Sequence, residues 1–259
     1  MEPETSFLTL AEAESLGIEH DPPSRLACQY CGKEREPLGV KGPNGKVRWV
    51  TFAACGCAGE VEEEARRDKA EKAKREADAV KKLLRAGVPM RFIASEIRRP
   101  ESLRFIESLG ERTGRGLYLY GGVGAGKTSE ASAIVKAVIR SGRKVVLTTT
   151  LSMLNEISKG YGDSEGKDIS HFIRADLLVL DDVGKENANS WAATTMFEVV
   201  NGRYERMLPT IYTSQYSFPE LEKRMSRSGE RESAQAVLSR IVQTTTLVDL
   251  GRIDRRRGR

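Results

Sequence analysis

Residues 121–128 constrain the fold of this chain more than any other feature, because they read Gly-Gly-Val-Gly-Ala-Gly-Lys-Thr. The pattern Gly-x-x-x-x-Gly-Lys-Thr is meaningful when a strand precedes it and a helix follows it. Residues 116–120 supply an apolar strand, and residues 127–139 have helix-forming composition. The glycines allow backbone N–H groups to point at phosphate oxygens beside a helix N-terminus. The sequence therefore predicts a phosphate cradle in an α/β domain.

The cradle predicts ATP and Mg²⁺ as its ligands. Lys127 would reach the β- and γ-phosphates, and the hydroxyl of Thr128 would bind the magnesium ion. The residues expected to contact the nucleotide are Gly121, Gly122, Val123, Gly124, Ala125, Gly126, Lys127, Thr128 and Ser129.

A second run, residues 177–182, predicts the acidic partner of this loop. Four apolar residues precede Asp181 and Asp182, as in a buried strand that ends in carboxylates. A carboxylate at that position can hold hydrated Mg²⁺, so Asp181 is expected to take the metal role and Asp182 to orient or activate the attacking water. A strand that simply ends in a polar turn is the alternative.

Short apolar runs alternate with helical stretches from residue 116 onward. Strands separated by helices predict right-handed crossovers and a parallel sheet covered on both faces. Thr213-Ser214-Gln215 closes one of these strands and would bring a polar group toward the γ-phosphate and the attacking water. The predicted strands are residues 116–120, 144–148, 176–180, 210–213 and 246–250.

All four cysteines lie between residues 28 and 57, as Cys28-x-x-Cys31 and Cys55-x-Cys57. Two such pairs can close a tetrahedral zinc site with four thiolates, which is structural because no position stays open for water. A redox dithiol is the alternative, but it leaves the second pair unexplained. His20 could replace one cysteine, although a histidine in such a segment is usually exposed.

The charge distribution points to nucleic acid as one partner. The formal net charge is +5, and residues 252–259 concentrate arginines that could neutralise phosphates. A solvated basic tail is the alternative. The sequence has no run of about 18 apolar residues and no signal-peptide pattern at its start, so we expect a cytoplasmic protein without a membrane partner.

These features predict three parts: a zinc-binding module at residues 1–57, a helical linker at 58–109 and an ATPase domain at 110–259. The linker should contain a helix over about residues 59–85, with one narrow apolar stripe that faces its own domain or a partner. The stripe consists of Ala70, Ala73, Ala77, Val80 and Leu84.

Residues 86–255 resemble the AAA+ helicase loaders of the DnaC and DnaI type and the related IstB transposition ATPases. The matching stretches include Gly87 to Phe92, residues 116–128, Leu178 to Gly184, Asn201 to Tyr204 and Pro209 to Ser214. The resemblance implies an AAA+ P-loop fold with a central parallel sheet flanked by helices. It also implies three partners: a hexameric, DnaB-like replicative helicase, single-stranded DNA, and further copies of the ATPase domain.

The resemblance also implies roles for individual residues. Lys127 and Thr128 would belong to Walker A, Asp181 and Asp182 to Walker B, and Thr213 to Gln215 to sensor 1. Arg240 would be the arginine finger and Arg255 the sensor 2 residue. The implied catalytic set is Lys127, Asp181, Asp182, Gln215, Arg240 and Arg255.

The chain departs from the family pattern at three places. Gln215 replaces the usual Asn of sensor 1, and Ser129-Glu130 replaces a His-Leu pair. Asp182 replaces the usual second acidic residue, Glu, which suggests slow, switch-like hydrolysis. An insertion over about residues 151–173, with Lys159, Tyr161 and Lys167, lies where this class contacts DNA, although a solvated loop is the alternative.

The main hypothesis is an ATP-dependent loader that delivers a replicative helicase onto single-stranded DNA, with residues 1–57 facing the helicase. One alternative is a transposase-assisting ATPase that binds duplex DNA. Another is an adaptor whose zinc module binds a protein while the nucleotide acts as a structural clamp.

Overall fold

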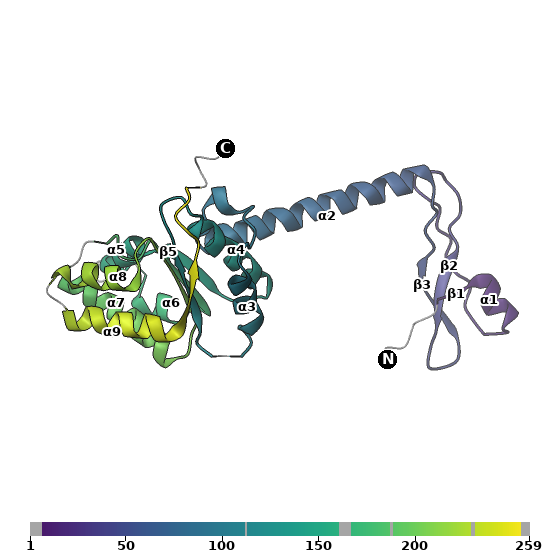
Figure 1. Cartoon of the computed structure of the whole chain (residues 1–259). Helices are drawn as coiled ribbons and strands as arrows, with labels where there is room; N and C mark the ends of the chain where they lie inside the picture. The colour runs from purple at the N-terminus through teal and green to yellow at the C-terminus, as the bar shows by residue number, and fades with distance from the viewer. Residues whose placement is uncertain (1–6, 112, 161–166, 187–188, 229–230, 255–259) are drawn as a thin grey trace. The chain divides into compact units, whose positions relative to one another are not determined.

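The chain forms two compact units, Met1–Ala77 and Asp78–Arg259. The computed structural model describes residues 7–111, 113–160, 167–186, 189–228 and 231–254 (Figure 1). The division falls within helix α2 (Ala58–Arg85), between the boundaries at residues 57 and 109 that the sequence predicts.

The first unit is small and has few buried apolar side chains. Its antiparallel sheet has the order β1-β2-β3, and helix α1 follows β1 directly. Among the described residues of this unit, the buried apolar ones are Ala13, Cys28 and Val47. A core of this size stabilises a fold weakly unless a metal or another crosslink supports it. The elements are β1 (Leu8–Thr9), α1 (Leu10–Ser15), β2 (Pro37–Lys41) and β3 (Val47–Phe52).

Helix α2 spans 28 residues, close to the range that the sequence predicts. The predicted apolar stripe differs from the observed packing, since Ala70, Ala73 and Ala77 are exposed while Leu83, outside the stripe, is buried. An alanine side chain gains little free energy from burial because its apolar area is small. Three alanines are therefore too few to hold this highly charged helix against another surface. Among the described residues, no helix is both long and apolar enough to cross a membrane.

The second unit is built on a five-stranded parallel sheet of order β5-β6-β7-β4-β8. Each strand begins within one residue of the position that the sequence predicts, which confirms the parallel α/β fold. β4, which leads into the phosphate loop, lies between β7 and β8. The strands are β4 (Gly116–Tyr120), β5 (Val145–Thr149), β6 (Leu177–Asp181), β7 (Thr210–Ser214) and β8 (Thr245–Asp249).

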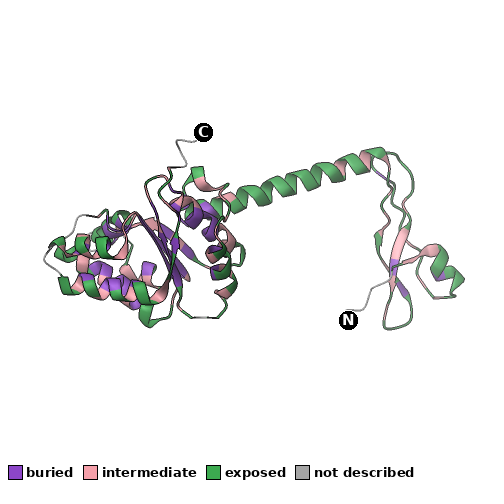
Figure 2. Ribbon diagram, in the orientation of Figure 1, coloured by how far each residue is buried: buried purple, intermediate pink, exposed green. Residues whose placement is uncertain are grey.

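Helices cover both faces of this sheet (Figure 2), and alternate residues of β4 and β6 belong to hydrophobic clusters on its opposite sides. Leu178 and Leu180 of β6 pack among α5 to α9, while Leu177 and Val179 pack against α3 and α4. This alternation follows from the two-residue period of a strand. The helices are η1 (Met90–Phe92), α3 (Pro100–Ser108), α4 (Lys127–Arg140), α5 (Thr150–Gly160), α6 (Ile169–Ile173), α7 (Ser190–Glu205), α8 (Phe218–Met225), η2 (Ser226–Ser228) and α9 (Arg231–Thr244).

Arg203 on α7 is an arginine inside the core, with 1% of its surface exposed. Its guanidinium donates to the Thr210 hydroxyl at 2.8 Å. It also donates to four backbone carbonyls at 2.6 to 3.0 Å, those of Phe172, Ile173, Ala175 and Pro209. Burial lowers the pKa of this guanidinium to about 10, so the group stays charged at neutral pH. Arg203 therefore ties the end of α6 and the start of β7 to α7.

Candidate nucleotide-binding site

The loop between β4 and α4 has the backbone that a phosphate cradle requires. Gly124 and Gly126 have φ angles of 77° and 97°, in the left-handed region that glycine adopts without strain. Helix α4 then begins at Lys127, so its free N–H groups face the loop. An anion in the loop would meet both these donors and the positive end of the helix dipole.

Lys127 lies inside the loop, with 8% of its surface exposed. Its ammonium group donates to the carbonyl oxygens of Gly121 at 2.8 Å and Gly122 at 2.9 Å. These contacts stabilise the curled loop around a positive charge. The charge is therefore already present where phosphate oxygens would enter.

Thr128 and Asp181 meet directly, although 53 residues separate them in the sequence. The Thr128 hydroxyl lies 2.9 and 3.1 Å from the two Asp181 carboxylate oxygens, and the Thr213 hydroxyl also donates to this carboxylate. Burial raises the pKa of Asp181, while these hydroxyls and the charge of Lys127 oppose the shift. A hydroxyl and a carboxylate are oxygen ligands of the kind that Mg²⁺ prefers, so these residues fit the metal.

Asp182 and Gln215 lie beside this centre, and neighbouring side chains already bind their polar groups. Asp182 has a φ of 60°, and its N–H donates to the Thr213 hydroxyl at 3.0 Å. Its carboxylate pairs with Lys185 at 2.9 Å. The Gln215 amide donates to the Tyr216 hydroxyl at 2.8 Å. The structure thus brings both residues to the strand ends that carry Asp181 and Thr213.

Of the two arginines that are expected to stabilise the transferred phosphoryl group, the structure describes Arg240 but not Arg255. Arg240 lies on α9, where its guanidinium donates to the Asn201 side chain at 2.6 Å. It stacks 4.9 Å from the ring centre of Phe197 and 5.6 Å from that of Tyr204. These partners belong to α7 of the same chain and not to the phosphate loop. Arg255 lies outside the described residues.

The predicted DNA-contacting insertion forms α5 and α6. Lys159 is exposed near the end of α5, whereas Lys167 pairs with Glu156 at 2.9 Å and lies 5.9 Å from the ring centre of Phe172. Tyr161 lies outside the described residues. The stacking role predicted for Tyr161 therefore stays a prediction.

The sequence does not predict two backbone contacts of this site. The N–H of Gly122 donates to the Gly251 carbonyl at 2.9 Å, and the N–H of Leu250 donates to the Tyr120 carbonyl at 2.8 Å. The segment after β8 therefore braces the phosphate loop. Its sequence, Leu-Gly-Arg, carries no signal of this role, because backbone groups make both contacts.

The four cysteine sulfurs of the first unit lie within 4.8 Å of one another. Two pairs, Cys28 with Cys57 and Cys31 with Cys55, are separated by 3.7 and 3.3 Å. Four thiolates on a tetrahedral zinc ion, at about 2.3 Å each, would lie about 3.8 Å apart. The cluster is therefore compatible with zinc.

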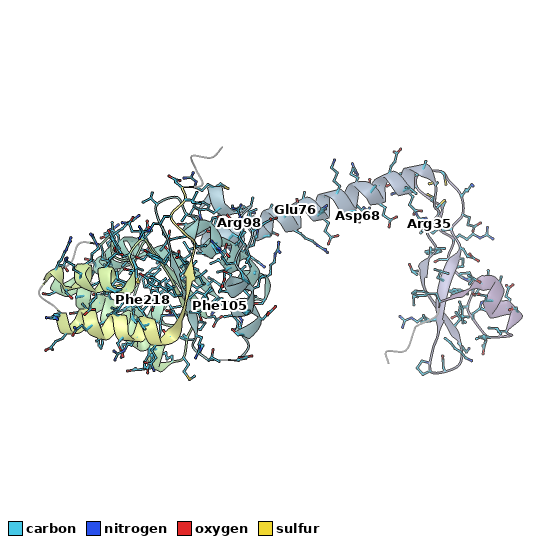
Figure 3. The ribbon with its side chains drawn as sticks, in the orientation of Figure 1. Arg35, Asp68, Glu76, Arg98, Phe105 and Phe218 are labelled. Atoms are coloured by element: carbon cyan, nitrogen blue, oxygen red, sulfur yellow. The ribbon has the colours of Figure 1, made fainter. Side chains whose placement is uncertain are left out.

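The surroundings of the cluster favour the thiolate form of Cys28. Backbone N–H groups of Tyr30 and Cys31 are the main cause that lowers the pKa of Cys28 to about 6. Arg35, labelled in Figure 3, contributes as well, with its guanidinium 3.9 Å from the Cys28 sulfur. Arg35 also pairs with Glu60, which joins the cluster to the first turn of α2. Contact with the Cys31 thiol and burial raise the pKa of Cys55 to about 12, so these surroundings favour ionisation of Cys28 and not of the whole cluster.

A glycine-rich loop on a helix N-terminus, next to a buried aspartate on a parallel sheet, defines the class of P-loop nucleotide-binding proteins. The pattern of the IstB-like ATP binding proteins matches residues 71–257, and the chain belongs to this family.

The relatives fall into two groups. The chain is 28% identical over 159 residues to the replicative helicase loader DnaI of Bacillus subtilis, which covers 59% of this chain and 51% of the relative. It is 34% identical over 102 residues to an ATP-binding protein of an insertion sequence in Mycobacterium tuberculosis, which covers 39% of this chain and 41% of the relative. The matches thus span about half the length of these curated relatives or less.

Solved structures show the same fold. The crystal structure of DnaI covers 62% of this chain and 93% of its own, with a TM-score of 0.54 and 20% identity. The crystal structure of the DnaC helicase loader covers 62% of this chain and 99% of its own, with a TM-score of 0.51 and 21% identity. These likenesses confirm the predicted AAA+ architecture of the second unit.

Proposed function

We propose that this protein is an ATPase that binds a hexameric replicative helicase and delivers it onto single-stranded DNA. The observation that carries the ATPase part is the meeting of Lys127, Thr128 and Asp181 around the phosphate loop. The likeness to a helicase loader over 59% of the chain supports the loading part.

The residues around the loop would share the chemistry as follows. Backbone N–H groups of the loop and Lys127 would hold the β- and γ-phosphates, and Thr128 and Asp181 would hold the magnesium ion. Bound magnesium neutralises charge on the phosphate oxygens. Asp182 and Gln215 would orient the attacking water once their contacts with Lys185 and Tyr216 open. Those contacts give a physical reason for slow hydrolysis in the isolated chain.

Self-association would complete the site. The guanidinium of Arg240, on α9, binds side chains of α7 and not the phosphate loop of its own chain. We therefore propose that Arg240 acts on the nucleotide of a neighbouring copy. Arg255 would contact the phosphates of its own chain. ATP binding would order the copies around DNA, and hydrolysis would release them. We place this activity in the bacterial cytoplasm.

The first unit would bind zinc and face the helicase. We expect purified protein to contain about one zinc ion per chain, because four sulfurs gather at a spacing that suits this ion. Cys55→Ser should lose the ion and leave residues 7–57 open to protease, since the small core cannot replace the crosslink. Native mass spectrometry and limited proteolysis measure the two effects.

His20→Ser provides the matched control for Cys55→Ser, because His20 makes an edge-to-face contact with Trp49, with ring centres 5.4 Å apart, and is not part of the cluster of four sulfurs. This variant should keep its zinc. A metal-free wild type that resists protease as well as the zinc-loaded form would contradict the structural role of the ion.

The loading role is tested with a purified helicase, labelled single-stranded DNA and ATP. We expect the protein to bind the helicase and to raise the amount of helicase on DNA by about tenfold. The Lys127→Ala variant should still bind the helicase but should not load it. Lys127 lies in the phosphate loop, and without it ATP would be held poorly. Co-sedimentation and DNA anisotropy report the two steps. A protein that neither binds helicase nor changes its loading would contradict the proposal.

A second candidate function is assistance to a transposase, which the insertion-sequence relative supports with 34% identity over 102 residues. Preference for duplex over single-stranded DNA in the same anisotropy assay would favour it. A third, a zinc adaptor with the nucleotide as a clamp, would show no measurable ATP turnover in the wild type, while Lys127→Ala leaves the binding of its protein partner unchanged.

A further inference from the structure

Residues 93–99, here called the strap, connect η1 to α3 and lie along helix α4. The ammonium group of Lys136, on α4, donates to the carbonyls of Ile93 at 3.2 Å and Ser95 at 2.6 Å. The hydroxyls of Ser95 and Ser129 lie 2.9 Å apart. The strap therefore reaches the first turn of α4, directly after Thr128.

Glu130 fixes the other end of the strap. The N–H of Arg98 donates to both carboxylate oxygens at 3.2 and 3.1 Å, and the N–H of Arg99 donates to one of them at 3.1 Å. Glu130 is 3% exposed, so its charge depends on these donors in place of water. Its position in the first turn of α4 adds the favourable helix dipole. Figure 3 labels Arg98 near this end of the strap.

The buried carboxylate of Glu130 restricts the strap to one position, because moving the strap would break hydrogen bonds to a buried charge. If the strap moved away, Glu130 would lose its three hydrogen bonds while still inside the protein, and two backbone N–H groups would lose their acceptor. An apolar side chain at position 130 would impose no such penalty. The strap is thus held in one place by a charge that lies outside the reacting centre.

Two segments border the phosphate loop. One is the strap, through Ser95 and Ser129; the other is Gly251–Arg252, where a Cβ on Gly122 would lie 3.1 Å from the Arg252 Cα. A nucleoside attached to phosphates in the loop must lie outside the loop and against what borders it. The position of the strap therefore shapes the nucleoside end of the site.

We propose that Glu130 is a positioning residue for nucleotide binding, which acts by holding the strap beside Ser129. The inference rests on the proposed nucleotide site and adds a residue two positions beyond Thr128. Because the hydrogen bonds of the strap described above go to Ser129, Glu130 and Lys136 and not to Asp181, we expect Glu130 to govern affinity for the nucleotide and to leave the chemical step nearly unchanged.

Glu130→Gln tests this with a fluorescent ATP analogue, Mg²⁺ and full-length protein. The amide keeps the size of the side chain but offers one acceptor oxygen, so the Kd for the analogue and the KM for ATP should rise about tenfold. The kcat at saturating ATP should stay within about threefold of wild type. Glu96→Gln is the matched control, because Glu96 is an exposed carboxylate of the same strap, and both constants should stay within about twofold.

A second variant keeps the test valid if Glu130→Gln folds poorly. Lys136→Met retains most of the length of the side chain and removes two strap contacts without burying a charge, so the Kd should again rise, by about threefold. If wild type binds the analogue and both variants bind equally well, the inference is wrong while the nucleotide site stands. If folded wild type binds no nucleotide, the proposed function fails and the inference fails with it.

Discussion

Replacing Arg203 with methionine should lower the free energy of unfolding by about 3 to 5 kcal/mol, among the largest effects expected for one substitution. Methionine fills much of the same space but donates no hydrogen bond. Four backbone carbonyls and the Thr210 hydroxyl would lose the guanidinium, and three of the five bonds are buried. Urea denaturation of the full chain, followed by circular dichroism, measures the change.

Arg206→Met is the matched control for Arg203→Met. Arg206 lies three residues further along, is exposed, and donates to the Gly202 carbonyl at 2.8 Å. Its replacement should cost less than about 0.5 kcal/mol, since Arg206 is exposed to solvent and lies outside the core. Equal losses for the two variants would mean that the buried hydrogen bonds of Arg203 do not stabilise the fold.

Asp181→Asn should reduce ATP hydrolysis by about 100-fold or more, because a neutral amide is a poor ligand for magnesium. Single-turnover hydrolysis of labelled ATP measures this loss. Asp176→Asn is the matched control, because Asp176 precedes the same strand at its other end and accepts from the Lys144 N–H at 2.7 Å. Its rate should stay within about twofold of wild type. Full activity in Asp181→Asn would contradict the assignment.

The same substitution should leave stability unchanged or raise it. Burial raises the pKa of Asp181 in the folded state above its ordinary value. The ionised carboxylate therefore lowers the free energy of unfolding. This loss of stability is absent at a pH below the pKa of the unfolded state, and it is complete once the pH exceeds the pKa of the folded state. At neutral pH, without magnesium, asparagine removes the penalty, so the Tm of Asp181→Asn should equal or exceed that of wild type. A clear drop in Tm would show that the carboxylate stabilises the free protein.

Local patterns in the sequence predicted the scaffold of this site well. Apolar runs located the strands, and Gly126-Lys127 located the start of α4, because a phosphate loop requires that transition. The spacing of the cysteines likewise predicted that their sulfurs would gather. Each of these features depends on residues that are close together in the sequence or that lie at the end of a strand. In both cases the type of residue indicates where it lies in the fold.

Contacts between distant segments were beyond such reasoning. Arg203 occurs in Asn-Gly-Arg-Tyr, where nothing indicates burial, because its acceptors come from residues 172–175 and 209–210. Glu130 departs from the family pattern, yet its partners lie more than 30 residues away and are backbone groups without a side-chain signature. In the apolar stripe of α2, Ala70, Ala73 and Ala77 are exposed in the single chain, and docking of the stripe on a partner stays a prediction, since periodicity locates a face but does not identify what covers it.

The place of β4 between β7 and β8 also determines when this site can exist. During synthesis the glycine loop leaves the ribosome long before the two strands that hydrogen-bond to β4, and Gly251 arrives about 130 residues after the loop that it braces. Until then β4 exposes unpaired edges that other chains could join. We therefore expect the nascent chain to bind nucleotide only after β8 has joined the sheet.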